Sequence, residues 1–65
     1  MKKETLLATA PNWFDLRRLI AEYYYSNADD ITLSNGAVYK NGRKLSTEYY
    51  QKGKRWRFVF KSDIL

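Results

Sequence analysis

The sequence contains no cysteine and no histidine. Without cysteine the chain can form neither disulfides nor a thiolate zinc site, and without histidine it cannot complete a Cys/His cluster. The usual groups for nucleophilic and acid–base catalysis are therefore missing, and the few carboxylates are scattered along the chain. The acidic pair Asp29-Asp30 lacks the ligand number and spacing of a calcium loop. We expect a protein that is not an enzyme and that uses no cofactor and no metal.

Long apolar runs are missing as well. No run approaches the roughly 18–20 residues needed to span a bilayer, and the N-terminus lacks the apolar core of a signal peptide. These absences predict a soluble, cytoplasmic protein. A core in so short a chain rarely supplies more than roughly 3–5 kcal/mol. The two Trp, six Tyr and three Phe must then provide much of the buried surface, because each ring covers a large area.

Positive charge is concentrated in one stretch of the chain. The net charge is +5, and residues 40–61 hold eight basic side chains and one acidic side chain. This asymmetry favours a polyanionic partner, with nucleic acid ahead of an anionic membrane. Alternatively, the basic residues only keep a sheet edge soluble and prevent edge-to-edge pairing.

We predict that residues 1–10 form a loosely ordered N-terminal arm and that residues 11–65 form a single compact domain. Only Leu6 and Leu7 could anchor the arm to the domain. A helix is predicted over about residues 12–26, with an N-cap at its first residue. At about 100° per residue, six apolar residues form its core-facing stripe: Trp13, Leu16, Leu19, Ile20, Tyr23 and Tyr24.

After the helix the pattern changes to the alternation typical of strands. Asn35-Gly36 and Asn41-Gly42 each favour a two-residue hairpin, and Lys52-Gly53 marks a third turn. The sequence therefore predicts an α+β domain in which the helix packs on an antiparallel β-meander of three to four strands. The expected strands are residues 31–34, 37–40, 43–50 and 55–61.

Closing the hairpins on these turns sets the strand register, with a four-residue third loop over residues 51–54. The resulting cross-strand pairs include Leu33 with Val38, Tyr39 with Lys44, and Tyr49 with Trp56. The registers agree on a single apolar face, and a one-residue slip would move an apolar set to the wrong side. That face consists of Ile31, Leu33, Val38, Leu45, Thr47, Tyr49, Trp56, Phe58 and Phe60.

The opposite face of the predicted sheet is basic and aromatic. Basic residues on turn tips can reach phosphates, and a two-stranded ribbon fits the major groove of duplex DNA. We therefore expect binding to nucleic acid, DNA rather than RNA, with the lysines on phosphates and the arginines and tyrosines on bases. The candidate residues are Tyr39, Arg43, Lys44, Tyr50, Lys52, Lys54, Arg55, Arg57 and Lys61.

A second candidate surface lies on one flank of the predicted helix. Aromatic rings beside guanidinium groups suit a protein–protein hot spot. This surface predicts, as the alternative function, a small protein-binding module or an inhibitor of a host protein with an acidic surface. Its residues are Phe14, Arg17, Arg18 and Tyr25. The N-terminal arm could instead cover Phe14, and an exposed edge strand could form a homodimer.

The end of the chain resembles a known family. Residues 53–58 (GKRWRF), followed by residues 62–65 (SDIL), look like the wing and tail of small winged-helix DNA-binding proteins, such as the excisionases of phages and other mobile elements. The resemblance implies, as an alternative fold, a small winged-helix domain whose hairpin tip at residues 52–55 enters the minor groove. It also implies a phage or mobile-element regulator. The sequence departs from the family in its longer strand and in the Asn-Gly turns where a recognition helix is required.

Overall fold

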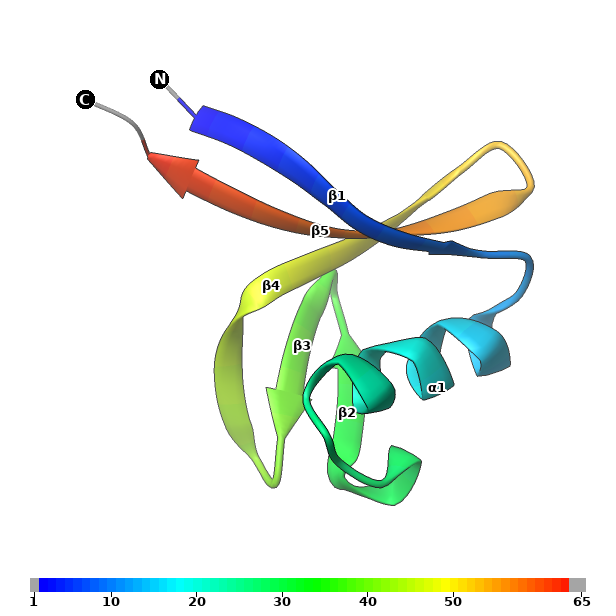
Figure 1. Cartoon of the computed structure of the whole chain (residues 1–65), viewed down its shortest axis with the longest axis vertical. Coiled ribbons are helices and arrows are strands. Elements are labelled where there is room, and N and C mark those ends of the chain that lie inside the picture. The colour runs from blue at the N-terminus through cyan, green and yellow to red at the C-terminus, as the bar shows by residue number, and fades with distance from the viewer. Residues whose placement is uncertain (1, 64–65) are drawn as a thin grey trace.

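The computed structural model describes residues 2–63 and shows, within them, one antiparallel sheet with a single α-helix packed on one face (Figure 1). The strand order is β1-β5-β4-β3-β2, so the chain crosses from one edge to the other through the helix and returns as a meander. The predicted α+β class is confirmed, with five strands rather than three or four. The elements are β1 (Lys2–Ala10), α1 (Trp13–Tyr23), the 3-10 helix η1 (Ala28–Asp30), β2 (Ile31–Ser34), β3 (Ala37–Lys40), β4 (Arg43–Lys52) and β5 (Arg55–Asp63).

The N-terminal residues form a strand, so the prediction of a loose arm is wrong. β1 pairs antiparallel with β5, and the register shifts by one residue at Leu7. Leu6 lies opposite Val59, whereas Ala8 lies opposite Phe58. Such a bulge changes which side of the strand each later residue faces, and it turns Ala8 toward the helix. The interrupted alternation explains why the segment does not look like a strand in the sequence.

The helix begins where the sequence predicts and ends earlier. The Asn12 side chain accepts a hydrogen bond from the Asp15 N–H (2.8 Å), which is the expected N-cap. At the other end, Tyr25 has a φ of 54°. Its N–H donates to the Glu22 carbonyl (3.1 Å), and the N–H of the next residue donates to the Ala21 carbonyl (2.8 Å). These bonds form a Schellman motif in which tyrosine stands where glycine is usual, so the sequence gives no stop signal.

The first two hairpins form as predicted. Asn35 and Asn41 have φ values of 51° and 52°, and the glycine after each has a φ of 82°. Positive φ at both central residues is what a type I′ turn requires. The observed pairs include Leu33 with Val38 and Tyr39 with Lys44, which confirms the predicted register at these points.

The third hairpin is tighter than predicted. Lys52 lies opposite Arg55, so the loop contains two residues rather than four. A glycine with a φ of 62° makes the tight turn possible. Tyr49 therefore lies opposite Phe58, not Trp56. Because the slip is two residues and the side-chain period of a strand is two, every side chain stays on its predicted face.

β4 changes its register against β3 halfway along. Tyr39 pairs with Lys44. Two residues earlier in β3, Ala37 pairs with Glu48, so three residues of β4 lie opposite the single residue Val38. Extra residues in one strand bend it and increase its twist. β4 is strongly curved in this region (Figure 1).

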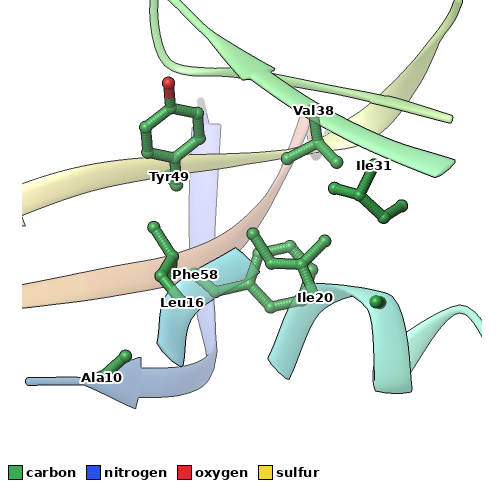
Figure 2. Packing of buried hydrophobic residues seen from close by; sticks show 8 residues of the cluster. Ala10, Leu16, Ile20, Ile31, Val38, Tyr49 and Phe58 are labelled. Atoms are coloured by element: carbon green, nitrogen blue, oxygen red, sulfur yellow. The ribbon is translucent and has the colours of Figure 1, made fainter. Parts of the chain in front are cut away.

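The core lies between α1 and the facing side of the sheet (Figure 2). Phe58 is completely buried, and its ring meets those of Tyr23 and Tyr24 edge-on at 5.2 and 6.4 Å between centroids. Aliphatic side chains contribute more than the aromatic composition suggests. The other buried members are Ala10, Leu16, Ile20, Ala21, Ile31, Val38 and Tyr49.

Three aromatic residues predicted for the core are partly exposed. Trp13, Tyr23 and Phe60 have exposed fractions of 36%, 50% and 37%. The two helix residues stand at the ends of α1, which is 11 residues long. β1 and β5 project past the helix toward the chain termini (Figure 1), and Phe60 belongs to the C-terminal half of β5. The short helix thus limits the size of the core.

The structure excludes the winged-helix alternative. Within residues 2–63, the region that should hold a recognition helix is formed by β2, β3, β4 and their turns. Ser62 and Asp63 continue β5 rather than begin a helix. Ile64 and Leu65, the last two residues of the resemblance, lie outside the described residues. None of the helical segments within residues 2–63 has the length and apolarity needed to cross a membrane.

Replacing Phe58 by alanine tests the core. We expect Phe58→Ala to lower the free energy of unfolding by about 3–5 kcal/mol, because the change leaves a cavity at a fully buried site. This equals most of the stability of a domain of this size. Phe14→Ala is the matched control, since Phe14 is 77% exposed and its loss should change stability by less than about 0.5 kcal/mol. Urea denaturation followed by circular dichroism measures both, and equal midpoints would contradict this core.

Candidate nucleic-acid interface

The outer face is the side of the sheet that is turned away from α1. Residues directly opposite each other on antiparallel strands share a face. Tyr50 is paired with Arg57, and both alternate with buried residues of the core. The same reasoning places seven of the nine residues predicted to bind nucleic acid on the outer face: Tyr39, Lys44, Tyr50, Lys52, Arg55, Arg57 and Lys61.

The other two predicted residues lie elsewhere. Arg43 pairs with Lys40 and lines a pocket with Tyr24, on the helix side of the sheet. Lys54 is exposed in the two-residue turn between β4 and β5. The structure therefore brings most of the predicted set together on one surface, but Arg43 belongs to a different one.

A hydrogen-bonded network occupies the centre of the outer face. The Tyr50 hydroxyl donates to Glu4 Oε2 (2.8 Å) and accepts from Arg57 Nε (2.9 Å). Arg57 Nη2 lies 3.9 Å from the same carboxylate oxygen, and its Cζ lies 5.8 Å from the centroid of the Tyr50 ring. Arg57 and Tyr50 are half-buried. Because their polar atoms already have partners, these residues join β1, β5 and β4 rather than stand open to a ligand.

Lys61 is also compensated by a carboxylate. Its Nζ lies 3.4 Å from Glu48 Oε1 and 5.9 Å from the centroid of the Tyr50 ring. Both charged side chains are more than a third exposed, so solvent screens the pair and it contributes little to stability. The pair nevertheless lowers the positive charge at the middle of the face.

Glu4 is the functional neighbour that the sequence analysis missed. It lies opposite Lys61 because β1 pairs with β5. The sequence does contain one signal for this pairing. Residues 58–60 are a continuous apolar run, which is typical of a strand buried on both faces and flanked by two others. Val59 is indeed completely buried, on the outer face, between Leu6 and Glu48 of the neighbouring strands.

Basic side chains without an acidic partner gather at the two ends of β4. Among the side chains of residues 3–62, the basic members of ion pairs are Arg57 and Lys61. Arg55 Nη2 donates to the neutral Thr9 hydroxyl (3.1 Å). The turn at one end of β4 carries Lys40, Arg43 and Lys44, and the turn at the other end carries Lys52, Lys54 and Arg55. We call these groups the β3–β4 tip and the β4–β5 tip (Figure 1).

The predicted protein-binding patch on the helix is divided. Arg17 Nε donates to the Ile31 carbonyl (3.0 Å), so this residue ties α1 to β2. Tyr25 lies past the end of the helix in a left-handed conformation, so the helical projection that placed it beside Phe14 does not apply. Phe14 and Tyr25 are 77% and 98% exposed. Arg18 is exposed one turn from Phe14 and stays its neighbour.

Known proteins provide no template for these surfaces. Comparison of the chain with protein-family models, with curated proteins and with solved structures finds no match. Within residues 2–63, no three side chains of the types that bind metal ions lie together. The basic tips and the exposed aromatic side chains are therefore the features from which a function can be argued.

Removing one hydroxyl tests the central network. We expect Tyr50→Phe to lower the free energy of unfolding by about 1 kcal/mol, because one hydroxyl oxygen satisfies both a carboxylate and a guanidinium. Tyr39→Phe is the matched control, since within the described residues no hydrogen bond involves its hydroxyl. Thermal denaturation of Tyr50→Phe, of Tyr39→Phe, of Glu4→Gln and of the Tyr50→Phe/Glu4→Gln double variant measures the coupling. Strictly additive losses would show that the network does not act as a unit.

Proposed function

We propose that the protein binds nucleic acid, with duplex DNA as the preferred form, through the two basic tips of β4. The observation that carries the proposal is that the basic residues of the tips have no carboxylate partner among the side chains of residues 3–62, whereas those between the tips do. Unpaired cations attract phosphates most strongly, because no local carboxylate competes for them.

The spacing of the tips supports a duplex as the ligand. β4 contains ten residues, so its ends lie at most about 30 Å apart at about 3.3 Å per residue. One turn of B-DNA is roughly 34 Å long. Because β4 is curved, the tips lie closer together than this limit and within the length of one turn, so both can contact phosphates of the same stretch of duplex with the outer face between them (Figure 1). The deep, narrow major groove of duplex RNA suits a sheet less well.

The residues of the predicted set then have different functions. Lys44, Lys52 and Lys54 contact phosphates, as does Arg55, which is exposed at its tip. Tyr39 is half-buried on the outer face opposite Lys44 and is the better candidate for contact with a base or sugar. In the proposal, the network at the centre of the face keeps the surface rigid. Arg57 is thus proposed as a support rather than as a reader of bases.

Salt dependence and a charge-matched control test the proposal. We expect the logarithm of the affinity for a 20-base-pair duplex to fall steeply with the logarithm of the salt concentration, by about 0.9 for each phosphate contact. The double variant Lys52→Gln/Lys54→Gln should bind more weakly and reduce this slope by about 2. Fluorescence anisotropy with a labelled duplex measures both quantities.

Arg18→Gln is the control, because Arg18 is exposed on the helix, far from either tip. It should leave the affinity and the slope almost unchanged. A flat salt dependence would refute the electrostatic mechanism. If Arg18→Gln lowers the affinity for the duplex as much per removed charge as the tip double variant does, net charge alone attracts DNA.

A protein partner is the second candidate function, and one observation favours it. Tyr25 is 98% exposed and occupies a left-handed position where a side chain is sterically unfavourable. Such outliers concentrate at functional sites. Tyrosine is also enriched at the energetic centres of protein interfaces. The exposed ring of Tyr25 does not pack in the core. In this second proposal, the ring contacts a protein partner.

We expect Tyr25→Gly to raise the free energy of unfolding by about 1 kcal/mol, since glycine adopts this conformation without a steric cost. Chemical denaturation measures the change. Ser26→Gly at the next position is the control and should not stabilise the chain, because the Ser26 hydroxyl donates to the Tyr24 carbonyl. A loss of stability in Tyr25→Gly would show that the ring has a structural purpose and would remove this argument for a protein partner.

A further inference from the structure

A pocket opens on the helix side of the sheet, between the C-terminal end of α1 and the β3–β4 tip. Its volume is about 450 Å³, within the range of sites that hold small organic molecules. It is lined by Tyr24, Lys40, Asn41, Arg43 and Leu45. Four of these come from one hairpin and the fifth from the helix cap, so the fold brings them together from distant parts of the sequence.

One side of the pocket carries two positive charges in direct opposition. Lys40 and Arg43 are cross-strand partners next to the turn. Like charges at such positions repel each other, because the Cβ atoms are only about 4.5–5.5 Å apart. Neither forms an ion pair with a carboxylate among the side chains of residues 3–62. A bound dianion would remove the repulsion and accept hydrogen bonds from both side chains.

Another part of the pocket lining is apolar and held in place by the core. The hydroxyl oxygens of Tyr24 and Thr47 are hydrogen-bonded at 2.6 Å, and the ring of Tyr24 meets that of Tyr23 edge-on at 5.0 Å. Leu45 packs against the core. These contacts fix the Tyr24 ring and the Leu45 side chain in the lining of the pocket that also contains the two cations.

The backbone at the mouth of the pocket is held as well. The Asn41 N–H donates to the Asp30 carbonyl (2.9 Å), which connects the turn to η1. Asn41 is exposed at a φ of 52°, and its side-chain amide is available as a further donor at the rim. The site is thus preformed, which lowers the entropic cost of binding a ligand.

We propose that this pocket binds a nucleoside 5′-monophosphate group, with the phosphate between Lys40 and Arg43 and the sugar and base against Tyr24 and Leu45. The group is either a free nucleotide or the phosphorylated 5′ end of a nucleic-acid strand, since the chemistry of the two is the same. The site can be separated from duplex binding, because Lys40 and Arg43 lie on the helix side of the sheet, whereas the residues proposed to contact DNA phosphates lie on the outer face or in the β4–β5 turn.

Titration of ¹⁵N-labelled protein with adenosine 5′-monophosphate, adenosine and inorganic phosphate tests the assignment. We expect the monophosphate to shift the amide signals of the pocket residues and to bind at least about tenfold more tightly than either fragment, because each fragment lacks one half of the contacts. Equal binding of phosphate alone would refute the apolar half of the site. Equal binding of adenosine would refute the charged half.

A charge-matched pair of variants locates the site. Lys40→Gln should weaken binding of the monophosphate about tenfold, as expected for the loss of one charge-assisted hydrogen bond. Lys54→Gln, which removes the same charge from the opposite tip, should not weaken it. Equal effects of the two variants, or no binding at millimolar concentration to the folded protein, would overturn the proposal.

Two oligonucleotides distinguish the two sources of the group. A short single strand with a 5′-phosphate and the same strand with a 5′-hydroxyl are compared by competition with the mononucleotide. If the strand with the 5′-phosphate displaces the mononucleotide and the strand with the 5′-hydroxyl does not, the site takes strand ends. If neither strand displaces it, the site takes free nucleotides. Equal displacement by both strands would contradict phosphate recognition. The duplex assay with Lys52→Gln/Lys54→Gln is read separately, so either proposal can fail alone.

Discussion

The pairing of β1 with β5 is the interaction on which the rest of the structure depends. It makes β5 a central strand, so that Phe58 is buried under the helix and Val59 is buried on the opposite face. It also brings Glu4 within hydrogen-bonding distance of Tyr50, a residue 46 positions away in the sequence. In a chain without disulfides, this contact between the first and last strands must offset the entropy of closing nearly the whole chain.

Two carboxylates give the basic stretch its internal organisation. Glu4 and Glu48 compensate the arginine and the lysine in the middle of the outer face. Among the side chains of residues 3–62, no carboxylate pairs with the basic residues at either end of β4. A charge count cannot distinguish these groups, because all are lysine or arginine in one segment. The distinction depends on β1, which supplies Glu4 from outside that segment. Within one basic stretch, the residues in the centre therefore serve as structural contacts, and those at the ends are candidate ligand contacts.

The sequence predicts well those features that neighbouring residues decide. The Asn-Gly turns, the cap at Asn12 and the faces of the strands follow from local conformational preference and from a period of two, and all are present. Features decided by distant parts of the chain, β1 and its carboxylate, were wrong or missing. The tight third turn was missed although it is local, because Lys52-Gly53 is compatible with loops of two and of four residues. Likewise, alternation places most of the candidate site on one face. It does not show which cations are compensated, because that needs the tertiary pairing.

The extra residues of β4 opposite Val38 affect more than the local register. They curve the strand, so its two halves run in different directions, and each half ends in one of the basic tips (Figure 1). The turns determine which side chains stand at each tip, but the bend in the middle of the strand determines the angle between the tips. The side chains at the tips and the relative orientation of the tips are therefore determined by separate parts of the chain. Changing the number of residues at the bend would redirect one tip while leaving its composition intact.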